Sequence, residues 1–176
     1  ITKICFAKFS LLKRTDDQPE VFGEPIEILF NSPLQAGSTK QVRIYYSTTQ
    51  KSEAIQWLSA EQTLGKKHPF LFTQSQAIHG RSMLPCQDTP SVKITYDANV
   101  TVAAPLVALM SASNDGKVII SDSNEILYKF KLSVAIPSYL IALAVGDLGF
   151  KEIGPRSLVW AEHAVLDSAA FEFDET

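Results

Sequence analysis

The sequence predicts a mainly β protein with antiparallel strands. Three observations support this fold class. Apolar and polar residues alternate with a period of two along many short segments, which is the pattern of a half-buried strand. Turn-forming residues separate these segments, as they do between the strands of hairpins. Only one stretch, near the C-terminus, has apolar residues at helical spacing.

The strands expected from this patterning follow one another along the whole chain. Residues 1–9 already alternate as a strand in the middle of a sheet does. The alternation is clearest at 40–47, where Val42, Ile44 and Tyr46 share one face, and at 92–96. The other candidate strands are 26–30, 99–103, 106–111, 118–121, 126–133, 139–145 and 158–160.

The breaks between strands carry residues that favour turns. Asn114-Asp115-Gly116 predicts a hairpin turn. Loops are expected at 16–19, 31–33 and 154–155 because each combines proline with Asp, Asn or Gly. The stretch 161–171 has weak helical periodicity and predicts a short helix.

Length and composition exclude several classes of protein. With 176 residues, 45% of them hydrophobic and 20% charged, the chain has the composition of one ordinary globular domain. The longest apolar stretch, 139–145, is too short for a membrane-spanning helix. Sixteen basic against 19 acidic residues, without a basic run, argue against nucleic acid and membrane as partners. Two cysteines, Cys5 and Cys86, favour a cytoplasmic location, and Cys86 is expected to pack as a small apolar residue.

No metal or catalytic motif is visible in the chain. The three histidines, His68, His79 and His163, lack the spacing of a helical two-histidine zinc site. A Gly-x-Ser-x-Gly nucleophile motif is absent. We therefore predict no metal ligands and no catalytic residues in this sequence.

The segment 56–90 mixes polar and aromatic residues and is not patterned as core. An extended conformation over 72–77 would place Gln74 and Gln76 on the same side. Their carboxamides could then hold the amine and carbonyl of a substrate without adding charge. The alternative is that both are ordinary solvent-facing glutamines.

Residues 85–90 predict a rigid turn, because proline stands at each end. Asp88 is expected to cap that turn. Arg81, just upstream, is either a surface charge or a buried partner for a carboxylate.

Several sequence blocks of this chain belong together as a family signature. They are Gln56-Trp57-Leu58, Glu61-Gln62-Thr63, His68-Pro69-Phe70-Leu71-Phe72, Gln74-Ser75-Gln76-Ala77-Ile78-His79, Arg81, Leu84-Pro85-Cys86-Gln87-Asp88-Thr89-Pro90, Leu106-Val107-Ala108-Leu109-Met110, Ile136-Pro137 and Ile153-Gly154-Pro155-Arg156. With these blocks the chain resembles the N-terminal domain of the leukotriene A(4) hydrolase-like zinc aminopeptidases, which are gluzincins. The block from 74 to 90 is the most specific part of this resemblance, which extends over nearly everything from about Thr48 onward.

The resemblance implies a saddle-shaped mixed or antiparallel sheet over 1–170, truncated at its N-terminus, with 171–176 leading to an absent catalytic domain. Zinc would belong to the intact enzyme, with its ligands in that domain. Positions Gln74, Gln76 and Ala77 match residues that line the pocket for the amino end of peptide substrates. Ser75 and Gly80 stand where better-known members carry cysteine.

Two functions follow from these implications. The first is the substrate-positioning domain of a zinc aminopeptidase that removes N-terminal residues from peptides, inactive by itself. The second is a non-catalytic, β-rich interaction module, either a truncated isoform or a member whose zinc site has decayed.

Overall fold

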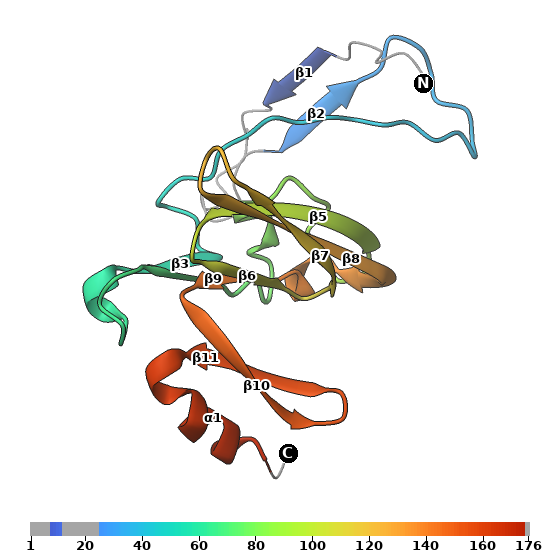
Figure 1. The fold of residues 1–176 in the computed structure, drawn as a ribbon. Coiled ribbons are helices and arrows are strands. Elements are labelled where there is room, and N and C mark those ends of the chain that lie inside the picture. Colours follow the sequence, from blue (N-terminus) through green and yellow to red (C-terminus); the bar gives the residue numbers. More distant parts are fainter. Residues whose placement is uncertain (1–7, 12–24, 175–176) are drawn as a thin grey trace. The chain divides into compact units, whose positions relative to one another are not determined.

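The structure is a computed structural model that describes residues 8–11, for their backbone only, and 25–174. The chain divides into two compact units, residues 1–47 and 48–176 (Figure 1). Most of the strand predicted over 1–9, together with Cys5 and the loop predicted at 16–19, lies outside the described residues.

The first unit contains one antiparallel pair. Strand β1 (Lys8–Leu11) pairs with β2 (Ile26–Leu29), which confirms the strand predicted at 26–30. The strand predicted at 40–47 is wrong, because these residues are exposed and have no regular secondary structure. The period-two pattern shows only that one face of the segment is apolar. It does not supply the neighbouring strand that must pair with the backbone.

The second unit contains three antiparallel sheets over its described residues. This arrangement confirms the mainly β, antiparallel fold class. The four-stranded sheet has the order β3 (Ile55–Leu58), β4 (Phe70–Thr73), β9 (Leu143–Gly146), β6 (Val107–Met110). The three-stranded sheet has the order β5 (Lys93–Ala103), β8 (Glu125–Pro137), β7 (Ser113–Ile120), and the third sheet is the pair β10 (Leu148–Gly154) and β11 (Ser157–Glu162).

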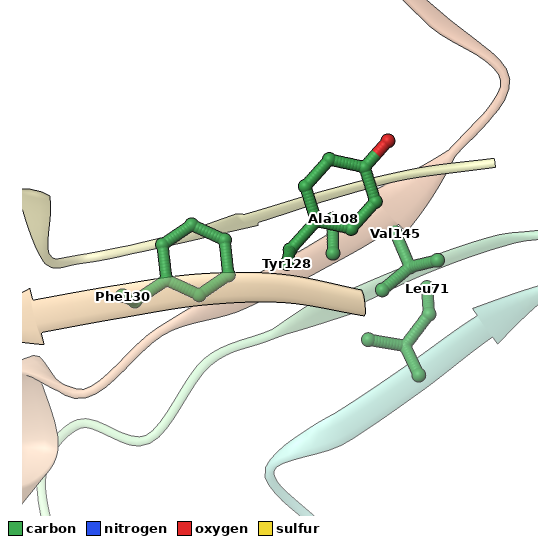
Figure 2. Close-up of a cluster of buried hydrophobic side chains, with 5 residues drawn as sticks. All are labelled: Leu71, Ala108, Tyr128, Phe130 and Val145. Carbon is green, nitrogen blue, oxygen red and sulfur yellow. The ribbon is translucent and has the colours of Figure 1, made fainter. Parts of the chain in front are cut away.

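The core lies between the four-stranded and the three-stranded sheets. Leu71, Ala108 and Val145 come from the first sheet, and Tyr128 and Phe130 from β8 of the second (Figure 2). All five are at most 9% exposed. Burial raises the pKa of the Tyr128 hydroxyl, which donates to the Leu106 carbonyl oxygen at 3.2 Å. Alternation along β5 is regular, with its apolar face half-buried toward this core.

The predicted hairpin turn at Asn114-Asp115-Gly116 is wrong. These residues lie inside β7, where the pairing with β8 shifts register between Asn114 and Lys117. Gly116 has φ +104°, and its N–H donates to the Asn114 side-chain oxygen at 2.7 Å. A glycine with positive φ suits a bulge as well as a turn, and here it forms a bulge. The turn between β7 and β8 is at 121–124.

Other predicted elements are confirmed or shifted at their ends. The candidates at 92–96 and 99–103 form one strand, β5, and those at 106–111, 126–133 and 158–160 correspond to β6, β8 and β11. The candidate at 139–145 is only partly a strand, since Pro137 precedes a 3-10 helix, η4 (Ser138–Leu140), before β9 begins. Strand β10 is not among the predicted strands.

The helices of the second unit are short. The predicted helix at 161–171 corresponds to η5 (His163–Val165) and α1 (Leu166–Glu172), while its first two residues belong to β11. The helix α1 packs against the β10–β11 hairpin (Figure 1). The remaining 3-10 helices are η2 (Ala60–Gln62) and η3 (Gly80–Ser82). Among the described residues, no helix is long and apolar enough to cross a membrane.

Candidate functional site

Strand β4 carries the chain into the candidate site. It is an inner strand, paired with β3 on one side and β9 on the other, and its Leu71 belongs to the core. At its end, the Thr73 hydroxyl accepts from the Leu143 N–H at 2.8 Å. The Gln74 N–H donates to the Ala54 carbonyl oxygen at 2.8 Å. The segment after Thr73 therefore starts from a fixed point in the sheet.

The three predicted substrate-binding residues lie together after this strand. The extended conformation considered for 72–77 is wrong, since β4 ends at Thr73 and residues 76–79 form a turn. The turn is closed by the His79 N–H, which donates to the Ser75 carbonyl oxygen at 2.9 Å. Gln74, Gln76 and Ala77 are all exposed. We call residues 74–79 the glutamine turn.

The Gln74 carboxamide folds back onto the turn, and the prediction that both carboxamides point the same way stays a prediction. The Gln74 side-chain oxygen accepts from the Gln76 backbone N–H at 3.2 Å. The peptide bond between Gln76 and Ala77 is cis. Within residues 25–174, the Gln76 carboxamide makes no hydrogen bond. The Gln76 side chain is exposed.

Ser75 lies between the two glutamines and points the other way. It is 2% exposed, and its hydroxyl has no hydrogen-bond partner among the described residues. An unpaired buried hydroxyl costs free energy of folding.

One clamp holds the glutamine turn to the segment before β3. The Ser82 hydroxyl accepts from the Ala54 N–H at 3.0 Å and donates to the His79 carbonyl oxygen at 2.8 Å. The Ser52 hydroxyl donates to the Ser82 carbonyl oxygen at 2.8 Å. The His79 Nδ1 atom lies 2.7 Å from a Glu53 carboxylate oxygen. These contacts fix the C-terminal end of the turn.

A second clamp is the carboxylate of Asp88, whose side chain is 2% exposed. Its Oδ2 accepts from the Arg81 N–H and Nε, each at 3.0 Å, and its Oδ1 accepts from the Ser138 hydroxyl at 2.5 Å. Burial by itself raises the pKa of Asp88. The hydrogen bonds from Ser138 and Arg81, together with the guanidinium charge, outweigh it and leave the pKa below its usual value.

The structure shows which of the expectations for Arg81 and Asp88 are correct. Arg81 is the partner of a buried carboxylate and not a bare surface charge. Asp88 caps the η3 turn at Arg81, so the expected cap within 85–90 is wrong. Cys86 is half-buried, and burial, with the Asp88 charge, raises the pKa of its thiol. A raised pKa fits a packing role better than a nucleophilic one.

The described residues contain no group of three or more His, Cys, Asp or Glu side chains that could hold a metal ion. Two of the histidines instead lie near carboxylates, His79 beside Glu53 and His163 Nε2 at 3.6 Å from Asp147. What this part of the chain offers chemically is two exposed carboxamides on a clamped turn.

Comparison with known proteins identifies the fold. The family described as Peptidase M1 N-terminal domain matches residues 8–140. The chain belongs to this family. The M1 match includes the glutamine turn and Asp88.

Curated relatives of this M1 domain include leukotriene A-4 hydrolase of Xenopus laevis, 52% identical over 155 residues, which covers 88% of this chain and 26% of the relative. Leucine aminopeptidase 2 of Yarrowia lipolytica is 44% identical over 172 residues, covering 96% of this chain and 24% of the relative. The structure of native leukotriene A4 hydrolase from Saccharomyces cerevisiae matches with a TM-score of 0.71 and 35% identity, over 96% of this chain and 24% of that one. The chain thus spans about a quarter of the length of these relatives.

The family resemblance in the sequence is confirmed. Sequence reasoning missed the bond between Asp88 and Ser138, because the two residues are 50 positions apart. It also missed the Glu162 carboxylate, which accepts from the Leu64 and Gly65 N–H groups and ties the loop after η2 to β11. The one sequence feature that pointed to these contacts was Arg81, for which a carboxylate partner was considered and which binds Asp88.

Proposed function

We propose that this chain is the substrate-positioning N-terminal domain of a zinc aminopeptidase, and that its glutamine turn lines the pocket for the substrate's free N-terminus. The observation that carries the proposal is the exposure of Gln74, Gln76 and Ala77 on a turn clamped on two sides. Membership of the M1 peptidase family supports the reaction class. The relatives named leucine aminopeptidase support action at the amino end.

The Gln76 carboxamide has the chemistry for this role. Its oxygen can accept a hydrogen bond from a substrate ammonium, and its N–H groups can donate to the first carbonyl oxygen. The Gln74 oxygen already accepts from the turn, so Gln74 offers its N–H groups. A neutral amide binds an ammonium more weakly than a carboxylate does. Most recognition of the charge must therefore come from the catalytic domain, the partner this proposal requires.

Zinc does not fit the described residues of this chain, since they contain no set of ligands for it. We assign the metal and the hydrolytic step to the part of the enzyme that lies beyond the matched quarter. The contribution of this domain is orientation of the peptide, which lowers the barrier by holding the reacting groups in place.

A chimera tests the proposal. Residues of this chain replace the matching segment of Yarrowia lipolytica leucine aminopeptidase 2, and kcat/KM is measured on a leucyl peptide. In this chimera, Gln76→Ala should lower kcat/KM about tenfold to a hundredfold, because a hydrogen bond to a charged group contributes about 1.5–3 kcal/mol. Selectivity for the free over the N-acetylated peptide should fall by a similar factor.

The matched control is Gln50→Ala, since Gln50 is an exposed glutamine of the same unit that the proposal leaves outside the pocket. It should leave kcat/KM unchanged, and zinc content and melting temperature should stay the same in both variants. An unchanged kcat/KM for Gln76→Ala would make Gln76 an ordinary surface residue. A folded, zinc-loaded chimera without activity would favour the non-catalytic interaction module.

A further inference from the structure

The residue before the glutamine turn and Asp88 after it both bond to the segment 138–143, which contains η4 and the first residue of β9. At the start of the turn, the Thr73 hydroxyl accepts from Leu143, the first residue of β9. Past its end, Asp88 accepts from Ser138, which lies five residues before Leu143 on the segment leading into β9. The chain is thereby fixed before the turn to the start of β9 and after the turn to η4, five residues upstream.

The contact between Asp88 and the chain after the turn is close. A Cβ atom at Gly80 would lie 3.0 Å from the Asp88 Oδ1 atom, so the carboxylate packs directly on the backbone there. Arg81 adds three bonds, two to the carboxylate and one from its guanidinium to the Asp88 carbonyl oxygen at 3.0 Å. Such charge-assisted, multidentate contacts restrict orientation more than a single neutral bond does.

We infer that Asp88 is a positioning residue, which holds the glutamine turn in the orientation that presents Gln76 to the substrate. Asp88 acts through Arg81, Gly80 and Ser138, and it does not touch the substrate itself. This inference rests on the proposed function for its kinetic consequence. Its structural part, the hold on the turn, is tested separately.

Amide hydrogen exchange on the full chain tests the hold. The reporter is the His79 N–H, which donates to the Ser75 carbonyl and not to Asp88. In Asp88→Asn, exchange at His79 should accelerate at least tenfold, while amides of β10 and β11 keep their rates. Unchanged exchange at His79, or an equal acceleration everywhere, would overturn the inference.

Two further variants make this measurement specific. Asp167→Asn is the matched control, because it removes an exposed carboxylate paired with Lys151 on the hairpin and helix, and it should not alter exchange at His79. Ser138→Ala keeps the carboxylate and Arg81 and removes one anchor. If Asp88→Asn does not fold, Ser138→Ala should still accelerate exchange at His79, and its failure to do so counts against the inference.

A double-mutant cycle in the chimera tests the kinetic part. Asp88→Asn should lower kcat/KM for a leucyl peptide about tenfold when Gln76 is present, and should have no further effect in the Gln76→Ala background, because both substitutions remove the same contact. Equal losses in both backgrounds would mean that Asp88 does not act through Gln76. If Gln76→Ala alone has no effect, the proposed function fails, and hydrogen exchange still decides whether Asp88 holds the turn.

Discussion

Replacing Ser75 by alanine should stabilise the protein. The Ser75 side chain is 2% exposed, and its hydroxyl has no partner among the described residues. A buried hydroxyl without a hydrogen bond costs about 1–3 kcal/mol. Alanine keeps the Cβ atom, so the substitution removes a single oxygen from the packing. We expect the free energy of unfolding to rise by about 1 kcal/mol, and the melting temperature by about 2–4 °C for a chain of this size.

The same substitution at Ser138 should act in the opposite direction. Ser138 is also 2% exposed, but its hydroxyl donates to the Asp88 carboxylate at 2.5 Å. Ser138→Ala should therefore lower the free energy of unfolding by about 1.5–3 kcal/mol, the range for a hydrogen bond to a charged group. The pair is matched for residue type, burial and substitution, and differs in the partner.

Urea unfolding of the full chain, followed by circular dichroism, measures both variants against the parent. Equal slopes with denaturant are required, so that a shift in midpoint reports stability. A loss of more than 0.5 kcal/mol in Ser75→Ala, a threshold near the size of ordinary surface substitutions, would show that its hydroxyl has a partner. Equal effects at the two serines would refute the argument that the partner decides the sign.

The remaining predictions concern acid stability and metal content. Because the pKa of Asp88 is lowered in the folded state, its contribution is present above the unfolded aspartate pKa of about 3.9 and is lost as pH falls through the folded value. Urea midpoints between pH 7 and pH 3 should thus decline more steeply below about pH 4 in the parent than in Asp88→Asn, and parallel declines would contradict this. The full chain by itself should bind no stoichiometric zinc and release no leucine from a leucyl amide. Elemental analysis that finds one tightly bound zinc per chain, together with turnover, would contradict the assignment of the metal to another domain.

The sequence by itself determined several of the strands, because the order of apolar and polar residues within a short segment already indicates a strand. The candidates that became β5 and β8 alternate over much of their length, those that became β6 and β11 are short apolar runs, and the structure pairs each of them in a sheet. The same pattern at 40–47 failed, because a strand also needs a neighbour to receive its backbone hydrogen bonds. Asn114-Asp115-Gly116 failed because glycine with positive φ serves a bulge as well as a turn.

In the candidate site, too, some features were predicted from the sequence and others required the tertiary structure. The sequence placed Gln74 and Gln76 on one side of the chain by assuming an extended segment, in which residues two apart share a side, but residues 76–79 form a turn. Only the tertiary structure decided that the strand ends at Thr73, that Ser75 is buried without a partner, and that Asp88 bonds to Ser138. Those features depend on which distant segments pack against each other in the fold. A hydrogen bond between such segments produces no periodic pattern in the sequence, so the sequence does not predict it.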